Sequence, residues 1–490
     1  MPDQYVKKGI HRSRGAQATS KGVLTQLSGL EEPVLEKYER VPTPSGIPQY
    51  RVFGTKHFSA VVNSKGTNGK GHTWAQALAS GLMELVERYS GKGHLRALRR
   101  ARRQTVMDLA DTDHLGFDDV LSSCFDPPTL TLSDEELSHV PLTWFEGRTL
   151  GGDTILLPEW VNRNIAHGQG TNGWAAGSTL DEALLQAVCE IAERHCNALV
   201  RYQRIRTPRI EPATIESPMV RGLIRRFESL GQTVDVRDFS LDTDLPVFGV
   251  FRRLPDGMVQ MNTGVAPWRD EALARALTES SQGERNSACL PEDEAAPLVG
   301  HDGTRQFTHM PSLEGGSLRD ELDRFARRVA RLHWKVSYID TTNPTIGIPT
   351  VIVDISGAKC RLDEVLNRPL IAAILADHMM VKDFESAQRY VAIGLERDPD
   401  NEPLYRYYGG QLALLRGDIK TAIDDLRVVY DAFSALPDLP IHLGASKVAL
   451  QAARMIGLCY QKMGDMDTAL EWFARIWPAL VNEGRPDSLP

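Results

Sequence analysis

One segment of the sequence occurs three times in related form, and this repetition constrains the fold more than any other feature. Residues 69–88 and 175–194 match at a constant offset of 106, and residues 270–282 match the second copy at an offset of 89. Each copy spaces its apolar and polar positions as an amphipathic helix does. The sequence therefore predicts that three related helices contribute to one body.

The segments around these helices indicate the fold class. Short β-rich runs such as 245–253 and 350–355 alternate with amphipathic helices up to about residue 365. This mixture predicts an α/β (α+β) catalytic body with three helix-bearing repeats. From about residue 369 the pattern is helical only. We therefore expect a catalytic domain at residues 1–365 and an all-α domain at residues 366–490.

The C-terminal part repeats a short turn. Residues 382–387, 417–422 and 464–469 share the pattern of Gly or Lys, then Asp, with Ala four positions after the Asp. The first spacing is 35 residues and the second is 47. The second approaches the first if the Pro-containing stretch at about 436–446 is a loop insertion. A period near 34 resembles tetratricopeptide repeats, which often form a protein-docking groove. Alternatively, these helices form a structural cap or a homodimer surface.

Composition excludes several classes of partner. The chain has 56 basic and 64 acidic residues, for a net charge of -8, so no overall positive field exists to hold nucleic acid or an anionic membrane. The N-terminus is polar, and no run of about 18 apolar residues occurs, so we expect a soluble, cytoplasmic protein. Six cysteines without a C-x-x-C pair indicate reduced thiols.

Carboxylates follow one face of the repeated helices. The polar positions are Ser80, Glu84, Glu87 and Arg88 in the first helix, Glu182, Gln186, Glu190, Glu193 and Arg194 in the second, and Arg275 and Glu279 in the third. A solvated face usually pairs Glu with Lys one turn away, whereas these stripes repeat carboxylates with little compensation. A single such stripe is more often a solvated or paired face, but the threefold recurrence favours a bound cation.

The expected cation is Mg²⁺ or Ca²⁺, because all candidate ligands are oxygens, and Mg²⁺ commonly shares protein carboxylates with substrate phosphates. Residues 68–71, Asn-Gly-Lys-Gly, precede the first helix and are predicted to form a turn and a helix N-terminus. Backbone donors and Lys70 could meet phosphate oxygens there. The spacing is not that of a Walker A loop. These features together predict a magnesium–nucleotide site.

The ordered motifs resemble the YcaO domain. They are Lys8 to Arg12, Gly46-Ile47-Pro48, Asn68 to Gly71, Ser80-x-x-x-Glu84-x-x-Glu87-Arg88, Asn172 to Gly177, Glu190-x-x-Glu193-Arg194, Arg275-x-x-x-Glu279, and residues 343–353. The resemblance covers about residues 5–357, and several separated motifs occur in the same order. Two positions differ from the family pattern: Ser178 stands where Asn is common, and Glu284 stands where Arg is usual.

The resemblance implies ATP held with Mg²⁺ among these helices. The implied nucleotide contacts, with Lys70 added from the residue argument above, are Lys8, Thr19, Lys70, Ser80, Ser178, Glu182, Gln186, Arg194 and Arg275. The implied metal ligands are Glu84, Glu87, Glu190, Glu193 and Glu279. Cys189 and Cys196 lie seven residues apart, and we interpret them as buried apolar side chains and not as catalytic thiols.

The resemblance also implies a reaction. Similar proteins activate a backbone amide of a peptide or protein by phosphorylating the amide oxygen, which leads to thioamides or azolines, and others are accessory to methylthiolation of a ribosomal protein. A competing hypothesis from another class is a nucleotide-binding scaffold that recruits a partner through the helical repeats without peptide chemistry. Release of ADP and phosphate distinguishes the two.

Overall fold

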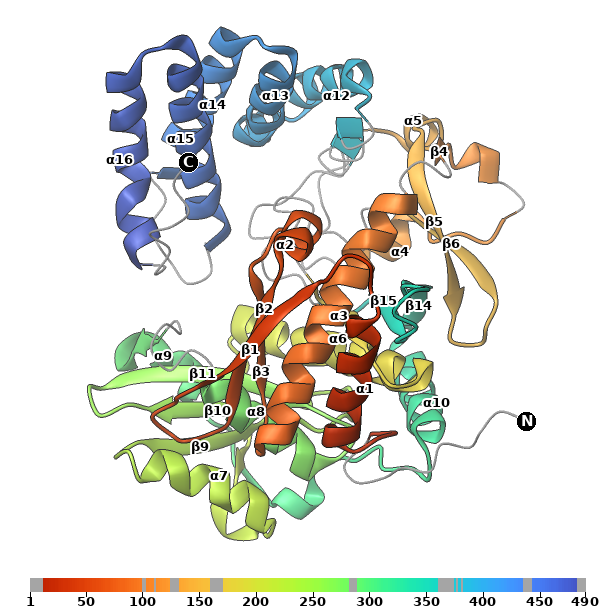
Figure 1. The fold of residues 1–490 in the computed structure, drawn as a ribbon, viewed down its shortest axis with the longest axis vertical. Coiled ribbons are helices and arrows are strands. Elements are labelled where there is room, and N and C mark those ends of the chain that lie inside the picture. The colour runs from red at the N-terminus through yellow and green to blue at the C-terminus, as the bar shows by residue number, and fades with distance from the viewer. Residues whose placement is uncertain are drawn as a thin grey trace.

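A computed structural model describes the chain over these ranges: 12–98, 103–109, 112–123, 132–158, 171–281, 289–359, 374–375, 378–379, 382–434 and 443–482. A body of three β-sheets with packed helices is followed by a region whose described residues from 384 onwards form helices and turns (Figure 1). The predicted mixed α/β body with a helical C-terminal region is confirmed. The predicted boundary near residue 365 lies outside the described residues.

Strands of the body form three sheets that are almost entirely antiparallel. The first has the order β1 (Leu35–Val41), β2 (Gln49–Gly54), β3 (Gly66–Lys70). The second has the order β12 (Leu290–Pro291), β11 (Met258–Val265), β10 (Val247–Arg253), β9 (Thr233–Asp238), β8 (Arg209–Ile210), β13 (Thr304–Arg305), with β13 parallel to β8. The third has the order β4 (Arg103–Gln104), β5 (Leu142–Thr149), β14 (Lys335–Asp340), β15 (Thr350–Ser356), β7 (Trp174–Ala176), and β6 (Thr154–Pro158) pairs with β5.

Helices cover these sheets and form the C-terminal region. The body helices are α1 (Ala16–Ser28), α2 (Lys56–Val62), α3 (Trp74–Leu98), α4 (Phe117–Leu121), α5 (Asp134–Ser138), α6 (Leu180–Gln203), α7 (Pro218–Glu228), α8 (Arg269–Ser281), α9 (Glu292–Val299) and α10 (Leu318–Val329). The C-terminal helices are α12 (Phe384–Arg397), α13 (Glu402–Arg416), α14 (Ile419–Ser434), α15 (Leu443–Met463) and α16 (Met466–Asn482). No described helix combines the length and apolar character needed to cross a membrane.

The three sequence repeats are three strand–turn–helix units, one from each sheet. They are β3–α3, β7–α6 and β11–α8, and each connection has three residues, 71–73, 177–179 and 266–268. The first backbone bond of each helix closes on the last connecting residue, with N–O distances of 3.0, 3.1 and 2.8 Å. Residues 68–70 were predicted as part of a turn, which is wrong. They are the end of strand β3, and the turn begins after them.

Two of these strands lie directly against the backbone of their helix. A Cβ atom on Gly69 would come within 1.9 Å of the Ala77 carbonyl oxygen. At the equivalent position in the third unit, a Cβ on Gly264 would come within 2.7 Å of the Ala272 carbonyl oxygen. The second unit has Ala175 there. The glycines at these strand positions thus permit a backbone contact that a side chain would block.

The C-terminal helices share one turn geometry at three places. Before each turn is a residue in the left-handed region, with φ between 62° and 82°. The aspartate that follows caps the next helix by accepting a hydrogen bond from the backbone N–H three residues later, at 3.1–3.2 Å. The capping residues are Asp383, Asp418 and Asp465. The alanine four positions after each of them is fully buried, so the repeated turn is a packing unit.

The helical region shares a hydrophobic core with the body. Helices α12 and α13 contribute buried residues such as Tyr405 to a cluster that contains Leu142 and Trp144 of strand β5. Arg397 at the end of α12 also pairs with Glu136 of α5 at 3.0 Å. Helices α12–α16 form an arc over this end of the body (Figure 1). Part of the core of the body therefore comes from the helical region.

A Gly69→Ala variant should destabilise the fold by about 1–3 kcal/mol, because the added methyl group collides with helix backbone that cannot move independently. Gly222→Ala is the matched control, since Gly222 lies in α7 and a methyl group there would have nothing within 4 Å. That control should be neutral or slightly stabilising. Chemical denaturation of both variants measures the difference, and equal stabilities would contradict the close-contact explanation.

A chain that ends at residue 359 should unfold at a lower temperature than the full chain, because the cluster around Leu142 and Trp144 loses the buried residues that α12 and α13 supply. A chain that ends at residue 434 keeps α12–α14 and serves as the control, since it retains that cluster. Thermal unfolding monitored together with magnesium–nucleotide binding tests this. If the chain that ends at residue 359 unfolds at the same temperature as the full chain, the shared cluster contributes little to the stability of the body.

Candidate active site

Lys70 lies at the point where the three repeated helices meet. It is the last residue of β3, and its Nζ forms an ion pair with Glu279 of α8. Burial lowers the pKa of Lys70 most, the positive charge of Arg275 also lowers it, and the carboxylates of Glu84 and Glu193 oppose both effects, so that the resulting pKa is about 8. Each of the three helices thus places a charged group near one lysine.

Equivalent positions of two repeats are in direct contact. Arg275 of α8 donates a hydrogen bond from Nη1 to Oε1 of Gln186 of α6 at 2.6 Å. These two residues correspond to each other in the sequence alignment of the repeats, and Ser80 is their counterpart on α3, where it is half-buried. The polar stripes predicted from the sequence therefore face a common space.

Carboxylates from α3 and α6 are crowded together. Burial raises the pKa of Glu87 well above its ordinary value, Arg88 opposes this, and the charges of Glu190 and Glu84 raise it further. Burial also raises the pKa of Glu190, although the nearby Arg194 partly counters this effect. Arg88 is the principal local compensation, since it pairs with Glu84 at 3.0 Å and with Glu87 at 3.3 Å. The carboxylates of Glu87 and Glu190 nevertheless remain disfavoured as free anions.

Other site carboxylates have defined polar partners. Thr263 of β11 donates a hydrogen bond from its hydroxyl to Oε1 of Glu193 at 2.7 Å. Buried Glu182, at the start of α6, accepts a hydrogen bond from the Ser13 hydroxyl at 2.6 Å and lies 3.5 Å from the Arg12 guanidinium. The segment before α1 therefore folds back onto the N-terminal end of the second stripe.

Three of the predicted nucleotide residues are not brought to this centre by a described contact. Thr19 is half-buried on α1, and Ser178 is half-buried in the connection between β7 and α6. Lys8 lies outside the described residues. Their proposed contacts with a nucleotide stay predictions.

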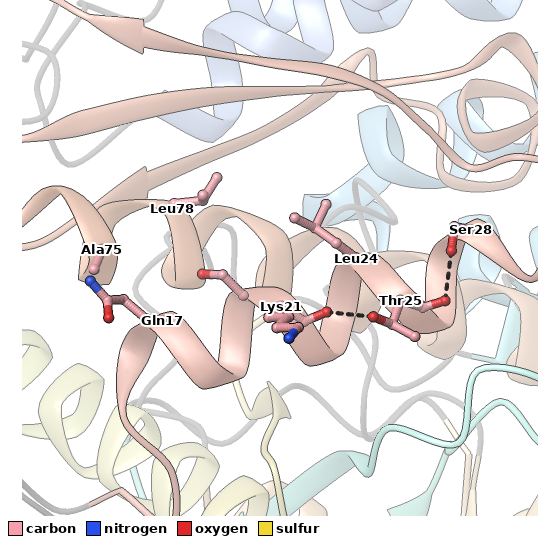
Figure 2. A pocket seen from close by; sticks show the side chains of 8 residues that line it. Gln17, Lys21, Leu24, Thr25, Ser28, Ala75 and Leu78 are labelled. Carbon is pink, nitrogen blue, oxygen red and sulfur yellow. Dashed lines mark hydrogen bonds between the residues drawn. The ribbon is translucent and has the colours of Figure 1, made fainter.

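A surface groove of about 510 Å³ lies between α1 and α3, apart from these charges (Figure 2). Its lining residues are Gln17, Ser20, Lys21, Leu24, Thr25, Ser28, Ala75 and Leu78. None of the predicted site residues is among them. On α3, Ala75 and Leu78 lie on the face opposite to Glu84 at 100° per residue, so the groove is separate from the candidate active site.

The two cysteines on α6 are buried thiols of low reactivity. Burial raises the pKa of Cys189 to about 12, and burial also raises the pKa of Cys196 far above its ordinary value. A thiol that does not ionise near neutral pH is a poor nucleophile. Both side chains belong to the main hydrophobic core, in agreement with the interpretation from the sequence.

The donor set fits magnesium shared with phosphate better than a site made by protein alone. Among the described residues, no three His, Cys, Asp or Glu side chains are arranged to hold a metal ion. Mg²⁺ needs only one or two carboxylates when phosphates supply further ligands. A divalent cation bound there would reduce the repulsion among the carboxylates of Glu84, Glu87 and Glu190. These residues, with Glu193 and Glu279, would hold it, while Lys70 and Arg275 would meet phosphate oxygens.

Sequence reasoning gave no site role to three residues that contact the site carboxylates. Arg88 could have been assigned one, because it lies on the predicted stripe and its counterpart Arg194 in the second repeat was predicted. Thr263 and Ser13 gave no such signal, because each is distant in sequence from the glutamate that it contacts. Only the folded arrangement reveals these two contacts.

Comparison with known proteins identifies the family. A family model described as "YcaO cyclodehydratase, ATP- and Mg²⁺-binding" matches residues 68–359. Because the match covers more than half of the chain, the protein belongs to the YcaO family. It is thus an enzyme of the ATP- and Mg²⁺-dependent cyclodehydratase type, and the predicted cofactors, ATP and Mg²⁺, are confirmed.

Individual relatives share less than a third of their aligned residues with this chain. An uncharacterized protein of Methanothermobacter thermautotrophicus is 26% identical over 328 residues, which are 59% of this chain and 81% of that protein. The Escherichia coli protein named ribosomal protein S12 methylthiotransferase accessory factor YcaO is 29% identical over 245 residues, 44% of this chain. That match spans only 40% of the Escherichia coli protein.

Two solved structures share the fold. One is YcaO from Methanopyrus kandleri bound with AMPPCP and Mg²⁺, with a TM-score of 0.55 and 21% identity, covering 73% of this chain and 96% of that one. The other is a heterocyclase in complex with substrate and cofactor, with a TM-score of 0.61 and 21% identity, covering 73% of this chain and 54% of that one. At this identity the likeness concerns the fold alone.

Replacing Glu84, Glu190 or Glu193 by Ala should weaken magnesium–nucleotide binding or turnover about tenfold or more, because phosphate charge is then poorly neutralised. Glu396→Ala, on an exposed position of α12, is the control and should behave as the unchanged protein. Calorimetry and ADP release measure the two quantities. Unaltered binding and turnover in all three folded site variants would remove the metal-site interpretation.

Proposed function

We propose that the protein uses ATP to activate a backbone amide of a peptide or protein substrate by phosphorylating the amide oxygen. The observation that carries this proposal is the convergence of the three repeated helices on Lys70. Cations from Lys70 and Arg275 beside carboxylates from Glu84 and Glu190 suit a phosphate group with bound Mg²⁺. Membership of the YcaO family supports the same reaction class.

The proposed chemistry follows from a property of amides. An amide oxygen is a poor leaving group until it becomes a phosphate ester. A nucleophile adds to the carbonyl carbon, the resulting oxyanion takes the γ-phosphoryl group of ATP, and ADP leaves. The carbon–oxygen bond then breaks, and inorganic phosphate departs. The protein supplies positioning and charge, and needs no covalent nucleophile, which suits the buried state of Cys189 and Cys196.

The nucleophile determines the product. A Cys, Ser or Thr side chain of the substrate gives an azoline, whereas external sulfide gives a thioamide. A third role is accessory to methylthiolation of a ribosomal protein, and the Escherichia coli relative supports this role by its name. The azoline and thioamide routes share the activation step and differ in the nucleophile.

We infer that the C-terminal helices are tetratricopeptide-like repeats that dock a protein partner in the cytoplasm. Three identically capped turns and the buried alanine that follows each of them support the repeat assignment. Because α12 and α13 share a core with the body, the repeats are held in a fixed relation to it. A docked protein would therefore be presented to the body at a defined place.

The purified full chain, supplied with ATP, Mg²⁺ and candidate peptides, should release ADP and phosphate faster with a true substrate than alone. Mass spectrometry identifies the product as loss of one water for an azoline or exchange of oxygen for sulfur for a thioamide. Glu190→Ala is the inactive control. Tight nucleotide binding without ADP release, alone or with peptides encoded by neighbouring genes, would favour the scaffold hypothesis.

A further inference from the structure

Helix α10 carries a cluster of arginines outside the site described so far. Arg324, Arg327, Arg328 and Arg331 line a surface hollow of about 300 Å³ on α10 and the 3-10 turn η5 (Ala330–Leu332) that follows it. Their spacing of three, four and seven residues places them on one face. The opposite face is buried in the main hydrophobic core through Leu318, Leu322, Phe325 and Val329.

Two of these arginines are fixed in position by neighbouring loops. Arg324 pairs with Asp320 at 3.0 Å and donates a hydrogen bond to the Glu314 carbonyl oxygen at 3.0 Å. Arg328 donates hydrogen bonds to the carbonyl oxygens of Asp244 and Ser312. Carbonyl oxygens are neutral, so the bonds of Arg328 orient its guanidinium without cancelling its charge.

Positive charge is concentrated in the hollow. Burial lowers the pKa of Arg328, the Asp244 carboxylate opposes this, and the charges of Arg331 and Arg324 lower it further. Hydrogen bonds from Arg324 and from the Gly316 backbone lower the pKa of Asp320, and the charges of Arg324 and Arg327 lower it further. Arg327 and Arg331 are exposed and have no ion-pair partner among the described residues. Four guanidinium groups thus face few carboxylates, although the whole chain is acidic.

The hollow lies on a helix that contacts α6, one of the helices that carry the candidate active site. Arg319, in the first turn of α10, pairs with Asp181 of α6 at 2.5 Å. Asp181 directly precedes Glu182, the first residue of the polar stripe on α6. Further along, Trp334 after η5 packs edge-on against His195 of α6, with ring centroids 4.7 Å apart. The α10–η5 segment therefore contacts α6 at two places along its length.

We propose that this hollow binds an acidic segment of the polypeptide substrate. Planar guanidinium groups hold carboxylates through paired hydrogen bonds, and two arginines already held in place by loops reduce the entropy lost on binding. A compact cluster of four cations suits a few carboxylates, whereas nucleic acid requires a longer basic track along its backbone. The link to the substrate rests on the proposed function, but the binding of an acidic peptide does not.

The test compares two double variants with the same change of net charge. Arg327→Glu with Arg331→Glu should weaken binding of a short fluorescent oligoglutamate peptide to the full chain about tenfold or more, measured by anisotropy at low salt. Lys56→Glu with Arg225→Glu, exposed positions on α2 and α7, should bind as the unchanged protein. Both should release ADP in the absence of peptide at the unchanged rate.

Three outcomes would overturn the proposal. The first is equal weakening in both double variants, which would show an effect of overall charge. The second is unchanged binding in the Arg327/Arg331 pair and also in its Gln counterpart, with thermal unfolding confirming that both are folded. The third is displacement of the peptide by an oligonucleotide or inorganic phosphate at lower concentration than by unlabelled oligoglutamate. Absence of any ADP release would refute the proposed function separately, since peptide binding is measured without catalysis.

Discussion

The backbone of strand β3 lies directly against helix α3 at Gly69, and the same contact recurs between β11 and α8 at Gly264. Such a contact fixes the rotation of a helix about its axis, because the helix cannot turn without a collision. In these two units the contact directs the polar stripe toward the common centre, and all three units have connections of equal length. The positions of the charged side chains thus follow from backbone packing, and individual side-chain contacts refine them.

The centre formed in this way is electrostatically unfavourable by itself. Burial raises the pKa of Glu87 and Glu190, and burial lowers the pKa of Lys70 to about 8, so groups of both signs are disfavoured in their ionised forms. Some stability is lost in return for a site in which ligand charges interact strongly, since little water screens them. The compact hydrophobic clusters around the helices offset that loss.

Features with a local signature could be predicted from the sequence. Helical periodicity indicates the stripes, and the self-similarity of the three segments joins them into one site. The glycine at residue 69 resembles a turn signal, whereas its role is to let two backbones approach. Contacts such as Thr263 with Glu193 depend on strand pairing, which leaves no local pattern. For the same reason, the packing of the helical region on β5 has no signal in the sequence.

The core shared by strand β5 and helices α12–α13 has a consequence for synthesis on the ribosome. Glu136 and Arg397, which are paired at its edge, are 261 residues apart in the chain. At about 5–20 residues per second, translation leaves β5 without the partners from α12 and α13 for roughly 10 to 50 seconds. During that interval Leu142 and Trp144 resemble the exposed segments that chaperones bind. The core around β5 can therefore be completed only after helices α12 and α13 have been synthesised.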